Sequence, residues 1–389
     1  MLKISHTGNM LNNILLFICF IFIVYDPWFF QTLRGFIIGS GIILCICLIR
    51  KNLFINRTNL YLILLIPIFL FLSTLPTIYN YQFDFSVTLM YLRMLIYITL
   101  LYFLYILLSD KKKLIYFLKA SIYLQFLIFI FCLLLPDFFK NFIFSVHTAE
   151  SFFQDSEQGY RLYIFTSMAF FQLSLFFGFV FNFLLNLYLE KKTNLLPIIF
   201  CFICGMASGR SFIVFALISI FISGLNLKLM ISLILGLILI YFIAINFQDN
   251  IYIYHALEPI IQYNSTQEVQ TSSSDKLIND MLILPSDKQF LIGDGLYTNS
   301  DNSYYMHTDS GYLRQLFYGG FLYLLLCLGI TTYIVKRVAL GWFNTKKFRF
   351  FISTMCIFGI GNIKADVFMY PGITFFLLFL LAFYSKEQQ

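Results

Sequence analysis

Charge is scarce in this sequence. Only 12% of its 389 residues are Asp, Glu, Lys or Arg, whereas 60% are hydrophobic. So few polar residues cannot cover the wet surface of a soluble domain, and the repeated apolar runs of about 20 residues are typical of membrane-spanning helices. The sequence therefore predicts an all-α, polytopic integral membrane protein, with residues 1–389 forming a single membrane domain.

The polar connections lack cysteine, and the motifs of soluble enzymes are missing. All eight cysteines fall in apolar stretches, which excludes a disulfide framework in the external loops. There is no Gly-Lys phosphate loop, no G-x-S-x-G elbow and no H-E-x-x-H. The acidic residues form no cluster with metal-ligand spacing, so we expect no metal, no cofactor and no ATP hydrolysis. The net charge of +7 is typical of basic cytoplasmic loops, and no nucleic-acid partner is expected.

The placement of charge divides the chain into about twelve transmembrane helices with both termini in the cytoplasm. On this layout, 17 of the 26 Lys and Arg residues lie on the cytoplasmic side. The sixth span is long enough to be tilted or to begin as an interfacial turn. The predicted spans are 11–25, 35–50, 60–78, 87–108, 114–135, a sixth from near Arg161 to about 189, 195–207, 212–223, 229–247, 312–335, 350–363 and 367–384.

Two external loops stand out, at residues 136–161 and 248–311. The second is too long to be a simple connection. Its end and the start of the next span, Ile292 to Gly320, carry the densest run of polar and titratable residues in the chain, including a turn predicted at Gly293-Asp294-Gly295. This stretch is interpreted as the rim of an active site.

Nine basic residues depart from the cytoplasmic pattern. Charge at or inside helix ends is costly unless it is paired or faces a wet cavity. Arg210 lies between two half-length apolar runs, a break that is tolerated beside protein or a water-filled cavity. Because arginine makes bidentate contacts with phosphate oxygens, several arginines facing one outward cavity suggest a diphosphate ligand. The nine are Arg34, Arg93, Lys140, Arg161, Arg210, Lys276, Lys288, Arg314 and Lys364.

Simpler interpretations of these residues remain open. Arg93, Arg161, Arg210 and Arg314 could each contact lipid headgroups at the interface. Lys364 repeats the pattern of Arg210 between the last two short spans, but Asp366 could simply neutralise it.

His307 is the candidate acid–base residue beside these arginines. His307, Arg314 and Tyr318 share one helical face if the helix reaches back to His307. Alternatively, Thr308 or Asp309 caps the helix and leaves His307 just outside it. Either arrangement places His307 and Arg314 near one external surface.

On these residues the chain resembles the O-antigen polymerase (Wzy-type) family, relatives of the O-antigen ligases. The resemblance covers most of the chain as a topology. The stretches that carry it are SGRS at 208–211, GDG at 293–295, HTDSGYL at 307–313, GG at 319–320 and NIK at 362–364.

The resemblance implies a GT-C-like fold and an inverting, metal-independent membrane glycosyltransferase. Such an enzyme joins polyprenyl-diphosphate-linked oligosaccharide repeat units at the periplasmic face of the bacterial cytoplasmic membrane, in the synthesis of lipopolysaccharide, capsule or another surface polysaccharide. A hydroxyl of one unit attacks the anomeric carbon of the growing chain and releases polyprenyl diphosphate. The implied partners are membrane lipid and, in the same pathway, a chain-length regulator and a flippase.

The site residues follow from this chemistry. Fixed positive charge stabilises a diphosphate leaving group, so Arg161 and Arg210 are assigned to the diphosphate, with Arg314 as a third candidate. His307 is expected to contact the acceptor hydroxyl as general base or orienting donor, and Asp309 is the alternative base. Further candidates are Arg93, Lys364, Tyr304 and Tyr305, the tyrosines as stacking partners for sugar rings.

Two other functions remain open. An O-antigen ligase, which transfers the finished glycan to a lipid acceptor, is poorly separated from a polymerase by one sequence. A flippase of lipid-linked oligosaccharide also needs basic residues in a cavity, but should carry charge deep in both halves of the bundle. The unusual charges gather instead at the outer face, next to the large loop, which favours an enzyme.

Overall fold

The computed structural model describes residues 6–30, 32–50, 57–108, 110–135, 163–168, 170–224, 281–301, 303–368 and 372–384, together with isolated positions between 141 and 264. Within these ranges the ordered elements are helices, joined by one small antiparallel hairpin of β1 (Trp28–Phe29) and β2 (Leu33–Arg34). The helices are α1 (His6–Tyr25), α2 (Gly35–Arg50), α3 (Arg57–Tyr79), α4 (Ser86–Leu108), α5 (Lys111–Leu134), α8 (Phe170–Leu189), α9 (Leu196–Ser208), α10 (Ser211–Ser223), α14 (Asp287–Ile292), the 3₁₀ turn η3 (Tyr305–His307), α15 (Gly311–Trp342), α16 (Lys347–Lys364) and α17 (Ile373–Phe383).

Several of these helices are suited to a membrane. In the described ranges, five are long and apolar enough to cross one: α3, α4, α5, α8 and α15. This confirms the prediction of an all-α membrane protein. The count of twelve spans stays a prediction. Most of the expected ninth span (229–247), of the loop 136–161 and of the part of the loop 248–311 before residue 281 lies outside the described residues.

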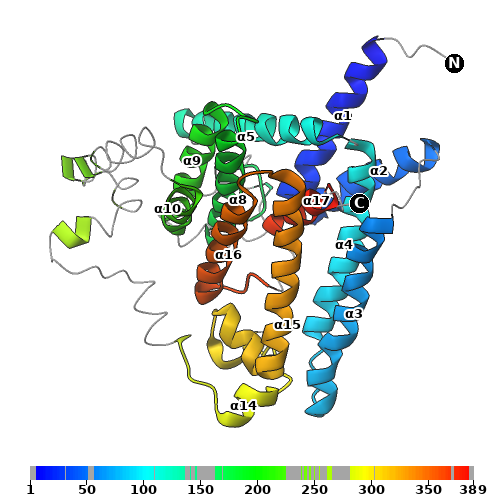
Figure 1. Ribbon diagram of the computed structural model, residues 1–389, viewed down its shortest axis with the longest axis vertical. Coiled ribbons are helices and arrows are strands. Elements are labelled where there is room, and N and C mark those ends of the chain that lie inside the picture. The colour runs from blue at the N-terminus through cyan, green and yellow to red at the C-terminus, as the bar shows by residue number, and fades with distance from the viewer. Residues whose placement is uncertain are drawn as a thin grey trace.

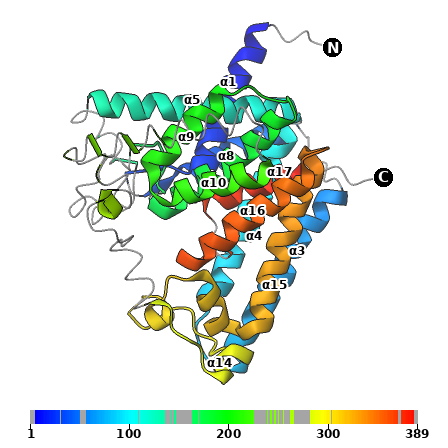
Figure 2. The same cartoon turned by 60° about the vertical axis from the view of Figure 1, so that its left-hand side comes forward.

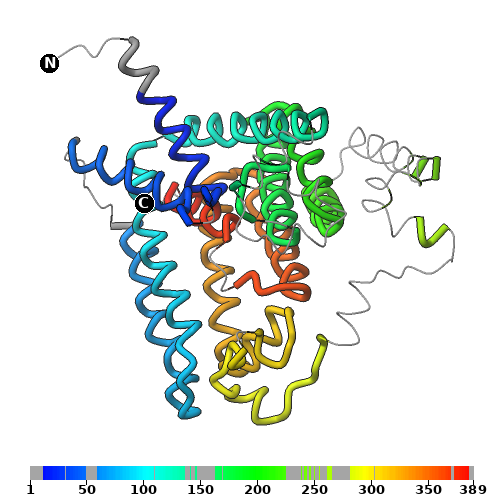
Figure 3. The backbone as a smooth tube through the Cα atoms, turned by 180° about the vertical axis from the view of Figure 1, so that it is seen from behind, coloured from blue at the N-terminus to red at the C-terminus, as the bar shows by residue number. Residues whose placement is uncertain are grey.

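The helices form two groups with a short helix between them. The long helices α3, α4 and α15 run side by side, while α8, α9, α10 and α16 pack against one another (Figures 1 and 3). Helix α17 lies between the groups, in contact with α4, α8 and α15. All of its residues are buried, as expected for a helix that is apolar on every side. Helix α5 crosses one end of the long helices and packs against α9 (Figure 2).

Asparagine side chains tie α8 to its neighbours. Asn182 accepts a hydrogen bond from the Ser353 hydroxyl at 2.8 Å and donates one to Thr354 Oγ1 at 2.9 Å, both on α16. One turn later, Asn186 donates to Ser223 Oγ at the end of α10, at 3.0 Å. Interhelical hydrogen bonds of this kind hold helices together where apolar packing alone gives little specificity. They fix the position of α8, whose other end forms part of the candidate site.

A carboxylate caps the start of α16. Glu190, just after α8, accepts hydrogen bonds at Oε1 from the backbone N–H groups of Asn344, Thr345 and Lys346 at 2.8, 2.8 and 2.9 Å. Lys192 Nζ lies 2.7 Å from its other oxygen. Burial alone would raise the pKa of Glu190, but these bonds outweigh it and lower the pKa to about 2. The charged form therefore stabilises this helix end.

Replacing Glu190 with glutamine is expected to lower the thermal unfolding midpoint at pH 7, because the amide keeps the shape and loses the charge. A carboxyl with a depressed pKa contributes stability above its ordinary pKa of 4.5, and that contribution is lost as the pH falls toward about 2. The difference between wild type and variant should therefore shrink across this pH window in detergent-solubilised protein. A difference that does not change with pH would contradict the assignment.

Two lysines donate hydrogen bonds to backbone carbonyls at the C-terminal end of α15. Lys111 Nζ donates to the Gly341 carbonyl at 2.5 Å, and Lys192 Nζ donates to the Trp342 carbonyl at 2.7 Å. Cations at a helix C-terminus satisfy its unpaired carbonyls and its dipole. The basic residues at the start of α5 and after α8 thus meet the end of α15, which agrees with their predicted placement on one side.

At its other end, α15 bends sharply at Gly320. This glycine has φ 71° and ψ −171°, a conformation that side chains rarely adopt. A Cβ atom there would lie 2.4 Å from the Leu291 carbonyl oxygen of α14. The bend lets Phe290 of α14 stack on Phe321, with ring centroids 5.4 Å apart. Close packing of α14 against α15 therefore requires glycine at this position.

We expect Gly320→Ala to destabilise the protein by about 2–4 kcal/mol, because it adds both backbone strain and a clash with backbone atoms. Gly329→Ala is the matched control, since Gly329 lies on the same helix and an added Cβ would meet nothing within 4 Å. Thermal unfolding of the two purified variants compares them directly. Equal midpoints would show that the bend is not required.

Two predicted helix starts are wrong. The sixth span was expected to begin near Arg161, but residues 163–168 are not helical and α8 begins at Phe170. Side chains hold this segment: Gln125 bonds both the N–H and the carbonyl of Phe165, and the Thr166 hydroxyl donates to the Tyr25 carbonyl at 2.5 Å. The helical part of this span therefore starts at Phe170, later than expected.

The last span was expected to begin at Val367, but α17 begins at Ile373. Side-chain oxygens of Asn362 and Asp366 accept hydrogen bonds from the backbone N–H groups of Val367 and Phe368 at 2.9 and 3.0 Å. Asn and Asp compete with helix formation in this way.

Candidate functional site

Arg314 is a buried cation enclosed by two aromatic rings. It lies in the first turn of α15 and is 5% exposed. Its guanidinium carbon lies 4.0 Å from the ring centroid of Tyr297 and 3.6 Å from that of Tyr304. Its Nε is buried without a hydrogen-bond partner, and within the described residues no carboxylate forms an ion pair with the group. Tyrosine faces attract the cation without neutralising it, so its charge remains available to an anion.

Tyr297 is held by hydrogen bonds at its side-chain hydroxyl and at its backbone. Its hydroxyl donates to Asp366 Oδ2 at 2.5 Å, and its backbone N–H donates to Asp84 Oδ2 at 2.6 Å. Burial raises the pKa of Tyr297 well above its usual range, and the nearby Asp366 charge raises it further. Tyr297 therefore keeps its proton as a hydrogen-bond donor and holds its ring against Arg314.

Asp366 joins three segments of the chain. Besides Tyr297 it accepts a hydrogen bond from Gln315 Nε2 at 2.7 Å and one from the backbone of Phe368. It is 8% exposed. The sequence suggested only that Asp366 neutralises Lys364. The partners Tyr297 and Gln315 were missed, because they lie 69 and 51 positions away and no local spacing signals them.

Asp84, in the turn between α3 and α4, anchors the site loop from the other side. It accepts hydrogen bonds from the backbone N–H groups of Tyr297, Thr298 and Ser86 at 2.6, 2.9 and 2.9 Å. Burial opposes its ionisation, but these bonds outweigh burial and lower the pKa of Asp84. The loop that carries Tyr297 is therefore held by a charged carboxylate that sequence inspection did not single out.

His307 and Asp309 precede α15 and do not belong to it. The helix begins at Gly311 with Ser310 at its N-cap position, so the prediction of a helical face reaching back to His307 is wrong. His307 lies just outside the helix, as the alternative expected, although the capping position is Ser310 and not Thr308 or Asp309. His307 is exposed, with φ 52°, and Asp309 is half-buried.

The two tyrosines expected to stack on sugars have different surroundings. Tyr304 is 41% exposed and presents one ring face to Arg314. Tyr305 donates its hydroxyl to Asp294 Oδ2 at 3.0 Å. Asp294 lies between Gly293 and Gly295, whose φ angles of 70° and 72° form the predicted turn. Tyr304 thus belongs to the arginine site, whereas Tyr305 fastens the turn.

The predicted break at Arg210 is confirmed. Helix α9 ends at Ser208 and α10 begins at Ser211, with Gly209 at φ 156° between them. The Ser208 hydroxyl donates to Ser174 Oγ in the first turns of α8 at 3.2 Å, and Arg210 is half-buried. The break therefore lies against the start of α8.

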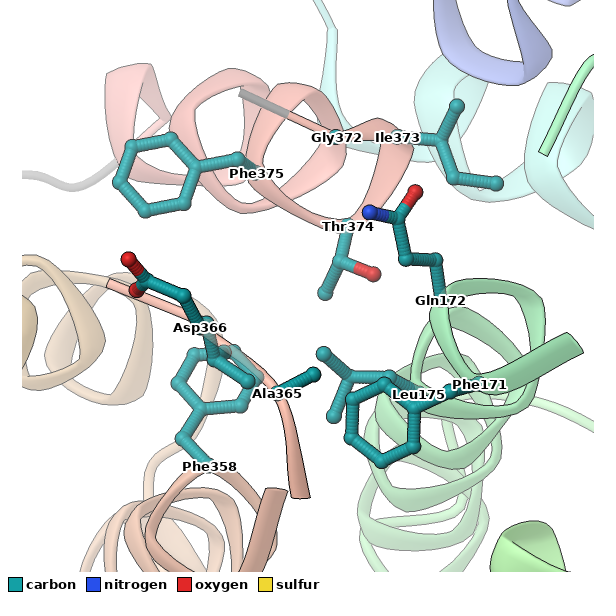
Figure 4. A pocket seen from close by; sticks show the side chains of 11 residues that line it. Phe171, Gln172, Leu175, Phe358, Ala365, Asp366, Gly372, Ile373, Thr374 and Phe375 are labelled. Atoms are coloured by element: carbon teal, nitrogen blue, oxygen red, sulfur yellow. The ribbon is translucent and has the colours of Figure 1, made fainter. Parts of the chain in front are cut away.

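The start of α8 also borders the Asp366 region. Phe171, Gln172 and Leu175 of α8 line a cavity together with Asp366 and the first turn of α17 (Figure 4). The helix break that carries Arg210 and the cavity that Asp366 lines thus both border the first turns of α8.

The remaining candidate residues from the sequence are not among the contacts described for Arg314. Arg93 is exposed on α4, and Lys364 is exposed at the end of α16. Arg161 lies outside the described residues. Arg34, which departs from the cytoplasmic pattern, forms an ion pair with Asp26 and donates to the Tyr97 hydroxyl at 2.7 Å. Arg34 is therefore part of the framework at the hairpin.

No family model, no curated protein and no solved structure matches the chain. The functional assignment therefore depends on the residues and geometry described above.

Proposed function

We propose that the protein is a membrane glycosyltransferase that polymerises polyprenyl-diphosphate-linked oligosaccharide repeat units, as the resemblance to O-antigen polymerases implies. The observation that carries this is Arg314, a buried guanidinium held between Tyr297 and Tyr304 with no carboxylate in ion-pair contact among the described residues. A buried charge is costly and is retained where a ligand uses it. A diphosphate supplies the required negative charge.

The reaction would use this charge on the leaving group. An acceptor hydroxyl attacks the anomeric carbon of the donor, the bond from that carbon to the diphosphate oxygen breaks, and the electron pair leaves with the diphosphate. Arg314 stabilises the developing negative charge, and Arg210 and Arg161 are the further cations assigned to it. The hydroxyl proton passes to His307, or to Asp309 in the alternative assignment.

An apolar groove beside the site supports a lipid-linked substrate. It lies between α3, α14 and α15 and is lined by Leu75, Tyr79, Leu291, Leu322 and Leu326, among others. The groove adjoins the bend at Gly320, six residues beyond Arg314 on the same helix. A substrate with a diphosphate at Arg314 could therefore extend an isoprenoid tail along this apolar groove.

The test is a reaction of the full chain, reconstituted in phosphatidylethanolamine–phosphatidylglycerol vesicles, with purified lipid-linked repeat units. We expect a ladder of lipid-linked chains that grows by whole units, together with released polyprenyl diphosphate. When a lipid A-type acceptor is included in the vesicles, transfer of glycan only to that acceptor would identify a ligase. Movement of units across the vesicle membrane without new glycosidic bonds would identify a flippase and contradict the enzyme assignment.

In that assay His307→Ala is expected to lower the turnover rate by about 10²-fold or more, because it removes the proposed base or orienting donor. Its abundance should not change, since His307 is exposed. Asp309→Asn, measured in parallel, is the comparison. Normal turnover of the His307 variant with a slow Asp309 variant would transfer the role to Asp309.

A further inference from the structure

Aromatic side chains face outward from the turn between α3 and α4. Tyr79, Tyr81, Phe83 and Phe85 are 65%, 90%, 92% and 43% exposed. The turn lies at the free end of these two long helices, on the same end of the molecule as α14 (Figures 1 and 3). A cluster of exposed large apolar side chains is the usual mark of a surface that contacts another molecule or a membrane.

Polar side chains of the same turn bond inward. Asn80 Nδ2 donates to the Pro76 carbonyl at 3.0 Å, within α3. Asp84 accepts hydrogen bonds from the backbone N–H groups of Tyr297 and Thr298 at 2.6 and 2.9 Å. The amide and the carboxylate, which would bind the hydroxyl groups of a sugar, are therefore used inside the protein, and the aromatic rings are left to face outward.

The backbone at Tyr81 is strained. The N–H of Tyr81 donates to the Ile78 carbonyl at 3.1 Å and that of Gln82 to the Thr77 carbonyl at 2.9 Å, the double bond pattern of a Schellman helix end. Tyr81 takes the position that glycine usually occupies there, with φ 54°. A tyrosine pays a conformational cost that glycine would avoid, and a ring that is 90% exposed recovers little of it inside the protein. Its ring therefore points to a contact outside the chain.

The apolar surface of the two helices continues into this turn. Leu75 and Ile78 of α3 and Leu89 and Leu92 of α4 are also exposed, and both helices are long and apolar enough to cross a membrane. The turn that joins two such helices lies where the hydrocarbon meets the lipid headgroups. Tyrosine and other aromatic residues are enriched at this depth, because the ring is apolar and the hydroxyl stays wet.

We propose that residues 79–85 form an anchor in the headgroup layer of the membrane, so that the partner of this surface is lipid. Asp84 in the anchor bonds the Tyr297 N–H at 2.6 Å, and the Tyr297 ring centroid lies 4.0 Å from the guanidinium carbon of Arg314. Two contacts thus connect the anchor with the buried cation. The anchor fixes the level of Arg314 relative to the lipid phosphates, where the anionic group of a lipid-linked ligand also lies.

The test measures the depth of a tryptophan placed in this turn of the full chain, reconstituted in phosphatidylethanolamine–phosphatidylglycerol vesicles. Phe83→Trp and Tyr81→Trp each exchange one exposed ring for another, so folding should not change. Added phosphatidylcholine carries bromine either near the headgroup or at the chain end, and iodide on both sides of the vesicle is the aqueous quencher. After subtraction of the two native tryptophans, measured in the wild-type chain, each variant should lose most emission to bromine near the headgroup and little to iodide.

Asn344→Trp is the matched control, because Asn344 is exposed in the polar turn between α15 and α16. Its emission should be quenched by iodide and not by either brominated lipid. The same pattern in Phe83→Trp and Tyr81→Trp would overturn the anchor. Iodide quenching that the soluble repeat-unit oligosaccharide suppresses would also overturn it and indicate that the rings stack on glycan. None of these results depends on turnover, so they test the anchor separately from the polymerase assignment.

Discussion

Replacing Arg314 with alanine is expected to reduce polymerisation by about 10²- to 10³-fold, the usual consequence of removing one fixed group that stabilises charge in a transition state. The reason is its enclosure: Tyr297 and Tyr304 hold the guanidinium at 4.0 and 3.6 Å, so neither water nor a flexible lysine can easily replace it. Arg314→Lys should recover only part of the rate, because an ammonium group cannot stack as a plane or bind a phosphate through two nitrogens.

The control for Arg314 lies on the same helix. Arg337 is also a buried arginine of α15, near the opposite end, where its Nη1 donates to the Tyr333 hydroxyl at 3.2 Å. Arg337→Gln should retain turnover per folded molecule. Polymer length and initial rate, each normalised to folded protein, are the measurements. Wild-type rates in Arg314→Ala would remove the diphosphate role from this residue.

Replacing Arg210 with alanine is expected to abolish polymerisation while the protein stays in the membrane. Arg210 lies at the break between α9 and α10, beside Gly209, where an added Cβ would lie 2.7 Å from Ser174 Oγ. The close contact fixes the break against α8. The position also begins α10, whose N-terminal dipole adds to the positive charge. Loss of the side chain removes this cation from the start of α10.

Arg349→Ala is the matched control for Arg210, because Arg349 Nη1 donates to the Ser223 carbonyl at the opposite end of α10, at 2.8 Å. It should change stability more than turnover. Chain lengths on lipid carriers, compared at equal membrane abundance, distinguish the two variants. Wild-type chain lengths in Arg210→Ala would show that the break is only structural.

Helix positions could be predicted from the sequence because apolar length and flanking charge directly determine membrane insertion. The predicted 35–50 and 87–108 spans agree with α2 and α4 within one residue, and the Ser208–Ser211 break is where it was expected. Helix starts that are set by side-chain hydrogen bonds could not be predicted. Gln125 and Asn362 hold the chain before α8 and α17, and nothing in local hydropathy reveals these contacts.

The candidate site likewise contains residues that could be predicted from the sequence and residues that could not. Arg314 could be singled out because a cation ahead of an apolar run departs from the charge pattern. Its enclosure by Tyr297 could not be predicted in a chain with 26 tyrosines, where no single one stands out. Asp84 accepts a hydrogen bond from the Tyr297 backbone and Asp366 accepts one from its hydroxyl, and these partners lie 213 and 69 positions away in the sequence. Such contacts depend on how α3, α15 and α16 pack.

The most direct test of the central claim is the lipid-linked glycan that accumulates in cells lacking this protein, separated by length and by membrane face. We expect single repeat units on the outer face of the cytoplasmic membrane, with surface lipid carrying at most one unit. Long polymers retained on the polyprenyl carrier would contradict a polymerase and indicate a ligase. Single units held on the cytoplasmic face would contradict the enzyme assignment and indicate a flippase.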